Sequence, residues 1–383
     1  MVCNSLIHQD CRLHRGDRPC APHKRDGREC SQCDLYDRIR TRVLIIKLDA
    51  LGDVLRTTSL LPALRDTYPG LHVTWITSTG GRALLADNPL VDRILTVEDN
   101  AWSYLSREHF HIGINPDADE RSTTMLALAR CDKKFGLLAD DHAMIVPLND
   151  AADRWWRMGL NDRLKRENRR TYSQLLYSIC ELDREVSRPQ FVLQAQHQER
   201  VRKRLAAGVS SDGRWIALNT GASTRWQYKR WSVHAYRRLV ELLTQSSLNL
   251  LLALVGGPEE AEFNQAILSG APPGLFDAGT ANSIGEFAAL LSHMHLVITP
   301  DSLGFHLASA LGIPSICLVG PTSPWELDVF DGSRVLIGDV ECIGCYHERC
   351  DRVRTCMGTL TAERVFDEAC AVLQGHARTA LAT

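Results

Sequence analysis

The sequence predicts an α/β protein with two doubly wound, Rossmann-like domains that face each other across a cleft. Its 383 residues exceed what a single hydrophobic core usually fills. In both halves, apolar runs of strand length alternate with stretches of helical periodicity, an order typical of parallel sheets with crossover helices. The pattern breaks around Val186–Pro189, where we place the linker between the domains.

Composition excludes several classes of protein. A hydrophobic share of 44% and a charged share of 23% are those of an ordinary globular protein, and a net charge of −2 argues against nucleic acid as a partner. The longest apolar run, Leu248–Val255, is a buried strand and is too short to cross a bilayer. Residues 1–10 lack the basic-then-apolar order of a secretory signal, so we expect a cytoplasmic protein.

The predicted boundaries follow the patterning. We expect a cysteine-rich segment at 1–40, a first domain at 41–186, a second at 187–358 with a cysteine-rich loop at 342–356, and a final helix at 359–375.

The first domain opens on residues 42–56, where a strand, Val43–Leu48, meets a tight turn at Gly52. A buried helix face follows. Asp53 therefore falls between strand and helix, at the carboxyl edge of a parallel sheet, which is where open α/β sheets bind ligands. From this stretch alone, a helix-capping or first-turn acid is the simpler interpretation.

The rest of this half contains strands and helices in alternation. The sequence predicts strands at Leu71–Thr77, Ile94–Val97 and His111–Asn115, and a helix from about Arg121 to Arg130. In Asp153–Tyr177, basic residues alternate with tryptophan, leucine and methionine. Two interpretations stay open here: a solvated amphipathic helical excursion, or a basic, partly aromatic surface for an anionic acceptor or membrane face.

The second half repeats the order of strands and helices. The predicted strands are Trp215–Asn219, Asn249–Val255, Leu296–Thr299 and Pro314–Val319. The predicted helices are about Ser232–Thr244, Glu259–Leu268, Ile284–Leu291, Gly304–Leu311 and Thr361–Leu373.

Three loops of this half carry chemistry. Residues 220–231 place small hydroxyl and cationic side chains between a strand and a helix, which suits a diphosphate. The turn Val255–Glu260 ends in acids that can bind ribose hydroxyls or simply occupy a helix start. In residues 299–312, Ser302 and Gly304 fall at a helix start, although Asp301 alone is explained as a cap and His306 as a core histidine.

Two clusters of cysteines lie near the ends of the chain. In a reducing compartment, Cys-x2-Cys pairs favour zinc or an iron–sulfur cluster over disulfides, and unligated thiols packed in small loops are the alternative. The candidate structural metal ligands are Cys11, Cys20, Cys30, Cys33, Cys342, Cys345, Cys350 and Cys356.

Taken together, the motifs resemble glycosyltransferase family 9, the ADP-heptose:lipopolysaccharide heptosyltransferases. The matching stretches are residues 43–55, Lys229–Trp231, Val255–Glu260, Asp301–Ala308 and Leu318–Thr322, and the resemblance covers about residues 41–375. It implies the GT-B architecture, with acceptor and donor bound mainly by the first and second domains, and a last helix that crosses back to the first. The sequence departs from the family at Leu303, where many members have glycine, and in its cysteine-rich ends.

The resemblance implies roles for the matching residues. Asp53 corresponds to the base that deprotonates the acceptor, and Lys229 to the lysine that neutralises the donor diphosphate in one inverting displacement. The implied donor-binding residues are Ser223, Thr224, Lys229, Glu259, Glu260, Asp301, Ser302, Leu303, Gly304 and His306. The implied acceptor-binding residues are Gly52, Arg56, Asp117 and Arg121.

The same resemblance implies partners. They are an ADP-heptose donor and a lipopolysaccharide or other lipid-linked glycan acceptor, with peripheral contact to the inner membrane and no cofactor for transfer. Three alternatives stay open: transfer from another nucleotide sugar, a silent nucleotide-sugar-binding or metal-binding protein, and an NAD-dependent oxidoreductase. The last is disfavoured because no Gly-x-Gly-x-x-Gly follows the first strand.

Overall fold

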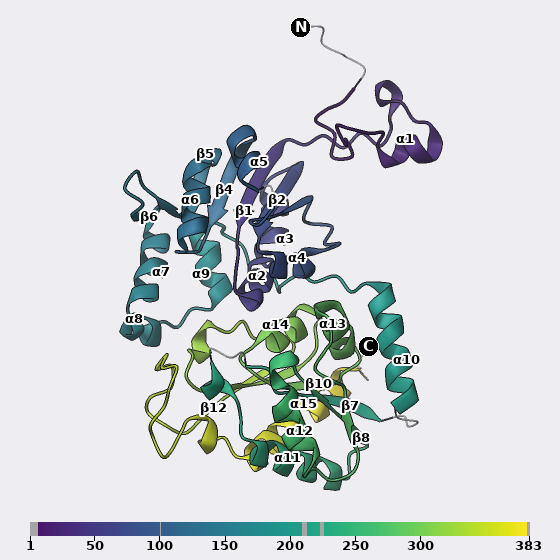
Figure 1. The fold of residues 1–383 in the computed structure, drawn as a ribbon, viewed down its shortest axis with the longest axis vertical. Helices are drawn as coiled ribbons and strands as arrows, with labels where there is room; N and C mark the ends of the chain where they lie inside the picture. Colours follow the sequence, from purple (N-terminus) through teal and green to yellow (C-terminus); the bar gives the residue numbers. More distant parts are fainter. Residues whose placement is uncertain (1–6, 100, 209–212, 223–225, 381–383) are drawn as a thin grey trace. The chain divides into compact units, whose positions relative to one another are not determined.

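The computed structural model describes residues 7–99, 101–208, 213–222 and 226–380, with the side chains of 207–208 and 376–380 excepted. The chain divides into two compact units. The first comprises Met1–Asp49, Leu60–Trp156 and Leu176–Ser187, and the second comprises Ala50–Ser59, Arg157–Leu175 and Arg188–Thr383. Each unit is built on its own sheet (Figure 1).

The first sheet has the order β3-β2-β1-β4-β5-β6. Its strands are β1 (Thr41–Ile46), β2 (Leu71–Thr77), β3 (Arg93–Thr96), β4 (His109–Asn115), β5 (Arg130–Ala139) and β6 (Ile145–Pro147). Only β6 at the edge is antiparallel. Residues Val43–Ile46 of β1 are fully buried, as expected for a central strand of a parallel sheet covered by helices on both faces.

Helices connect these strands. They are α3 (Leu60–Thr67), α4 (Thr79–Leu85), α5 (Ala101–Arg107) and α6 (Glu120–Leu128), and α7 (Asp150–Leu160) and α9 (Tyr172–Ile179) follow β6. The short helix α1 (Ala21–Asp26) precedes β1. The buried cluster around Leu44, Phe110 and Leu126 shows that α6 packs against this sheet through its apolar side.

The second sheet has the order β12-β11-β10-β7-β8-β9, with every pair parallel. Its strands are β7 (Arg214–Asn219), β8 (Leu250–Val255), β9 (Leu275–Asp277), β10 (Leu296–Pro300), β11 (Ser315–Val319) and β12 (Arg334–Ile337). Its helices are α10 (Ala195–Gly208), α11 (Val233–Gln245), α12 (Ala261–Leu268), α13 (Ile284–Ser292), α14 (Leu303–Ala310) and α15 (Ala362–Ala380). The short helices α2 (Leu51–Thr57) and α8 (Asp162–Glu167) also belong to this unit.

In both sheets the strand order reverses beside the first strand. The chain moves outward from β1 through β2 to β3 and then returns to β4 on the other side of β1. It does the same from β7 through β8 and β9 to β10. Ligands of open α/β sheets bind at the carboxyl ends of the strands that flank such a switch point. The two places to look for a site are therefore the ends of β1 and β4 and the ends of β7 and β10.

Most predicted elements are confirmed within one or two residues, and Leu71–Thr77 is confirmed residue for residue. Four strands were not predicted: β5, β6, β9 and β12. The helix predicted to Arg130 ends at Leu128, because Arg130 already begins β5. The first half of β5 is polar and partly exposed, so it lacks the apolar run that identifies a central strand.

The basic stretch Asp153–Tyr177 forms parts of three helices, α7, α8 and α9. Within the described residues, none of the helices combines the length and apolar character that crossing a membrane requires. Helix α15 buries Val365, Ala369 and Leu373 in the core of the second unit. Its predicted return to the first domain stays a prediction, as do the predicted domain boundaries.

Candidate active site

The switch point of the second sheet is organised by Asn219, the last residue of β7. Its side-chain Nδ2 donates to Thr299 Oγ1 at the end of β10 (2.8 Å) and to Ser302 Oγ (3.2 Å). A Cβ atom at Gly304 would lie 2.6 Å from the same nitrogen, so only glycine fits there without displacing the amide. Asn219 and Gly304 together bring the start of α14 against the end of β7.

The N-terminus of α14 offers backbone donors at this point. The first N–H groups of a helix have no partner within the helix, and the helix dipole favours negative charge beside them. Ser302 is the N-cap, and its side chain makes no capping hydrogen bond to the helix. The first turn, with Leu303 and Gly304, is therefore suited to binding an anion.

A buried ion pair lies beside this helix start. Lys229 Nζ is 2.7 Å from Asp301 Oδ2, and Thr322 Oγ1 donates to the same oxygen at 2.8 Å. The two charged side chains are only 12% and 14% exposed. Burial alone would raise the pKa of Asp301, but Lys229, His306 and the hydrogen bonds together hold it below the usual range. Asp301 is thus an anion that fixes the Lys229 ammonium at the carboxyl end of the sheet.

His306 lies one turn further along α14 and is also buried. Its Nε2 is 3.9 Å from Asp301 Oδ1. Burial and then the nearby Arg56 cation lower the pKa of His306 to about 3, against the opposing effect of Asp301 and Asp53. The ring is therefore neutral near pH 7. A Cβ atom at Gly52 would lie 3.0 Å from His306 Cδ2, which explains a glycine before Asp53.

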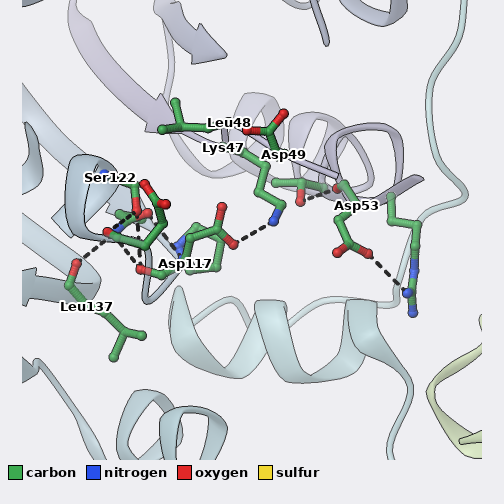
Figure 2. Close-up of polar contacts among 12 residues, drawn as sticks. Lys47, Leu48, Asp49, Asp53, Asp117, Ser122 and Leu137 are labelled. Atoms are coloured by element: carbon green, nitrogen blue, oxygen red, sulfur yellow. Dashed lines mark hydrogen bonds and ion pairs between the residues drawn. The ribbon is translucent and has the colours of Figure 1, made fainter. Parts of the chain in front are cut away.

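Asp53 lies in the first turn of α2, and its carboxylate is 38% exposed. Its Oδ1 is 3.4 Å from Nη1 of Arg56, one turn later (Figure 2). The Arg56 guanidinium is buried: it donates to the Glu326 carbonyl oxygen, stacks over the Tyr172 ring at 4.0 Å and lies 3.9 Å from Asp328. Burial disfavours this cation, but Asp53 and Asp328 raise its pKa overall. Arg56 therefore connects Asp53 to the loop after β11 and is not open to solvent.

The acids after β8 differ from each other. Glu260 is buried; its Oε1 accepts from Arg230 Nη2 (2.9 Å) and its Oε2 from the Gly257 backbone N–H (3.0 Å). Glu259 is exposed on the same turn. The carboxylate of Glu260 therefore holds the turn together. The other candidate loop residues, Ser223 and Thr224, lie outside the described residues.

The switch point of the first sheet also contains an ion pair. Lys47 Nζ, directly after β1, is 2.5 Å from Asp117 Oδ1, two residues after β4 (Figure 2). Asn115 holds this corner, because its Nδ2 donates to the backbone oxygens of Asp117 (2.9 Å) and Leu137 (2.8 Å). Both charges are largely buried.

Helix α6 begins beside that corner. The carboxylate of Asp119 caps it by accepting from the backbone N–H groups of Arg121 (3.0 Å) and Ser122 (3.3 Å). The half-exposed Arg121 side chain is paired with Asp119 (3.2 Å) and Asp49 (3.4 Å). Asp117 and Asp119 are thus engaged in separate local contacts.

The cysteine clusters were expected to hold zinc or an iron–sulfur cluster. Within the described residues, no group of three or more His, Cys, Asp or Glu side chains is placed to hold a metal ion, and the twelve described cysteines form no disulfide. Burial raises the pKa of Cys356 to about 11, and the neighbouring Cys342, Cys345 and Cys350 thiols act in the same direction. Because a bound metal ion itself deprotonates its thiol ligands, this raised pKa does not decide between free and ligated thiols, and the structural metal sites stay a prediction.

Three residues of the candidate site were not predicted: Asn219, Thr322 and Lys47. Each lies directly at, or within three residues after, the carboxyl end of a buried strand. That position was the available signal, since parallel strands collect such residues at one edge.

Comparisons with known proteins agree with this geometry. Residues 162–353, half of the chain, match the model of glycosyltransferase family 9 (heptosyltransferase). Lipopolysaccharide heptosyltransferase 1 of Escherichia coli O18:K1:H7 is 24% identical over 299 residues, which is 74% of this chain and 87% of that protein.

Two solved structures share the fold. The E. coli ADP-heptose lps heptosyltransferase II matches with a TM-score of 0.67 and 19% identity, covering 88% of this chain and 99% of that one. The iron-containing dodecameric glycosyltransferase TibC from enterotoxigenic E. coli H10407 matches with a TM-score of 0.54 and 14% identity, covering 88% and 77%. The predicted α/β class and GT-B architecture are therefore confirmed. The chain belongs to glycosyltransferase family 9 and is a glycosyltransferase.

Proposed function

We propose that this protein transfers a heptose from ADP-heptose to a glycan of the lipopolysaccharide core type. The observation that carries the proposal is the Lys229–Asp301 ion pair beside the uncapped N-terminus of α14. A diphosphate is the ligand that such a cation and helix start suit best. The relatives named as lipopolysaccharide heptosyltransferases support heptose and this acceptor.

The donor diphosphate binds to Lys229 and to the first N–H groups of α14 in this proposal. Negative charge develops on the diphosphate as the sugar leaves, and preorganised donors stabilise that charge without reorganising during the reaction. Asp301 positions the ammonium, while the neutral His306 beside it can hydrogen-bond without adding a second cation. Ser302 completes the phosphate site, while Ser223 and Thr224, which lie outside the described residues, remain proposed donor-binding residues.

Asp53 is the general base in this proposal. The acceptor hydroxyl oxygen attacks the anomeric carbon, the bond from that carbon to the diphosphate oxygen breaks, and the hydroxyl proton passes to the Asp53 carboxylate. ADP leaves with the bonding electrons, and the anomeric configuration inverts. Arg56 holds Asp53 in one orientation through its 3.4 Å contact, because its guanidinium is itself fixed by Glu326, Asp328 and Tyr172.

The other candidate residues receive narrower roles. Glu259 takes the ribose hydroxyls, since it is exposed on a turn whose shape depends on Glu260. Gly52, Asp117 and Arg121 remain proposed acceptor-side residues. A lipid-linked acceptor implies action at the cytoplasmic face of the inner membrane.

We infer that transfer proceeds without a metal, because Lys229 and the start of α14 supply the positive charge that Mg²⁺ supplies in other transferases. Chelation with EDTA should leave the initial rate unchanged. Cys356 then has a packing role: a Cβ atom at Gly320, two residues before Thr322, would lie 2.5 Å from its Sγ. Rapid loss of activity in EDTA without unfolding would contradict this inference.

A nucleotide screen tests the proposal. ADP should raise the melting temperature of the purified protein more than UDP or GDP does, because at equal concentration the ligand that binds the folded state most tightly stabilises it most. ADP-heptose with a core oligosaccharide should then yield ADP and a product of inverted anomeric configuration by NMR. Stabilisation by UDP in preference to ADP would contradict the choice of donor.

A further inference from the structure

Assuming the proposed function, we propose that α8, the turn after it and the loop after β11 form an acceptor subsite for an anionic glycan. A sugar ring packs on Trp325, and carboxylate or phosphate groups of the same glycan bind Arg169 and Lys165. All of these residues belong to the second unit. The subsite would extend acceptor binding beyond the residues proposed above.

The segment at residues 162–170 carries a net positive charge. Between residues 162 and 170 the basic side chains outnumber the acidic ones; they are Arg163, Lys165, Arg166, Arg169 and Arg170, against Asp162 and Glu167. The acids pair with Lys165 (3.5 Å) and Arg163 (3.8 Å), which leaves an excess of positive charge. Such an excess attracts anions over a distance set by salt screening.

Two of the cations lie over aromatic rings. The Arg169 guanidinium carbon is 4.8 Å from the centre of the Trp325 ring, and Lys165 Nζ is 4.5 Å from the centre of the Tyr346 ring. Both distances are within the range of cation–π attraction. Trp325 is nevertheless 47% exposed. An exposed indole beside a fixed guanidinium presents both an apolar ring face and a positive charge, as an acidic sugar requires.

The segment that carries Trp325 is held in position by the cysteine-rich loop. Tyr346 comes from the cysteine-rich loop; its hydroxyl donates to Glu326 Oε1 (3.0 Å) and accepts from the Ser323 backbone N–H (3.2 Å). Its own backbone N–H donates to the Pro321 carbonyl oxygen (2.7 Å). The cysteine-rich loop is thereby fastened to the segment that carries Trp325. The cysteine-rich loop, which has no role in the proposed transfer reaction, thus positions the proposed subsite.

The same segment reaches the catalytic groups. Thr322 donates to Asp301 of the donor site, and the Glu326 carbonyl oxygen accepts from Arg56, which contacts the proposed base. Trp325 lies between these two residues in the chain. A substrate bound on Trp325 is therefore on the loop that contacts both Asp301 of the donor site and Arg56, the neighbour of the proposed base, which favours an acceptor over a membrane surface.

Isothermal titration calorimetry tests whether the proposed subsite binds an anionic glycan in preference to a neutral one. The probe is the deacylated, phosphate- and carboxylate-bearing core oligosaccharide of lipopolysaccharide, titrated with ADP present, and maltopentaose is the neutral comparison. Trp325→Ala and Arg169→Ala should each weaken binding of the charged probe about tenfold. Higher salt should weaken binding to the wild type, and maltopentaose should bind less tightly than the charged probe.

Matched variants control for general effects. Trp102→Ala removes another exposed tryptophan, and Arg202→Ala removes another exposed arginine, one that pairs with Glu199; both variants should bind the probe as the wild type does. Unchanged binding by Trp325→Ala and Arg169→Ala, equal affinity for maltopentaose, or no binding by the wild type would each overturn the proposal. So would binding to phosphatidylglycerol vesicles that the same two variants abolish while probe binding persists. Failure of wild-type protein to bind ADP would instead contradict the proposed function.

Discussion

Both sheets end in a buried lysine–aspartate pair at the switch point, yet the two pairs have different surroundings. Lys47–Asp117 in the first unit and Lys229–Asp301 in the second are separated by 2.5 Å and 2.7 Å. In the first unit the adjacent helix α6 is capped by the carboxylate of Asp119. In the second, the side chain of the N-cap of α14 makes no such bond.

Because their surroundings differ, we assign the two lysine–aspartate pairs different roles. A carboxylate that caps its own helix satisfies the donors and opposes the positive end of the dipole, so an outside anion gains little. At α14 those donors and the Lys229 ammonium are available together. We therefore interpret Lys47–Asp117 as a pair that holds the corner of the first sheet, and Lys229–Asp301 as a pair that binds substrate.

The largest expected effect comes from the proposed base. Asp53→Asn should lower the rate of transfer about 10³-fold, because general base catalysis contributes about 10²–10⁴-fold, while the affinity for ADP is unchanged. Initial rates and ADP titration measure the two quantities. Asp66→Asn, an exposed acid of the next helix, is the matched control. Full turnover by Asp53→Asn would show that the base lies elsewhere.

Removing the second-unit cation should affect affinity and stability together. Lys229→Met should lower kcat/KM for the donor about 100-fold, since a charge-assisted contact to the diphosphate is lost. It also leaves Asp301 buried without its cation, which costs about 3 kcal/mol in the free energy of unfolding. The double variant Lys229→Met/Asp301→Asn should recover the melting temperature without recovering activity. Recovery of both would contradict a role in donor binding.

Removing the Lys47 cation of the first unit should lower stability without changing the affinity for ADP. Lys47→Met leaves the Asp117 carboxylate unpaired, so we expect the free energy of unfolding to fall by about 3 kcal/mol. Addition of Asp117→Asn should restore most of that loss. Denaturant unfolding followed by circular dichroism measures both variants. A Lys47→Met protein as stable as the wild type would show that this pair does not hold the corner.

A smaller effect is expected on the stability of the folded state at acidic pH. The His306 ring has a pKa lowered from 6.5 to about 3, so between these values the unfolded chain binds a proton that the folded chain does not. Acidification through this window therefore destabilises the folded state, by at most a few kcal/mol (about 1.4 per pKa unit). His306→Gln should flatten the fall in melting temperature between pH 6.5 and about 4. His72 in the first unit also has a lowered pKa, of about 4, so His72→Gln is the comparison variant for the same pH measurement. An unaltered pH profile in His306→Gln would mean that folding does not lower the pKa of this ring.

Much of the fold followed from the sequence because central parallel strands are continuous apolar runs. The apolar runs that begin at Val43 and Leu71 predicted strands directly, whereas the edge strands β9 and β12 are short and only partly buried. Short, partly exposed edge strands carry a weaker apolar pattern than central strands, although the edge strand β3 was predicted from its buried end.

The candidate site was predictable where a motif lies within one stretch of chain. Asp301, Ser302 and His306 are spaced along one helix start, so local sequence shows them. The role of Asn219 depends on Gly304, which lies far along the chain, and that contact appears only once β7 and β10 pair. The burial of Arg56 could not be predicted either, since it depends on the Glu326 carbonyl oxygen.

The central claim is that the second switch point, and not the first, binds the donor diphosphate. Calorimetric titration of ADP into Lys229→Met and Lys47→Met tests it directly, because the two variants remove the same group from equivalent positions. We predict that Lys229→Met binds ADP at least about tenfold more weakly than the wild type, while Lys47→Met binds it with wild-type affinity. Equal weakening in both variants, or weakening confined to Lys47→Met, would contradict the claim.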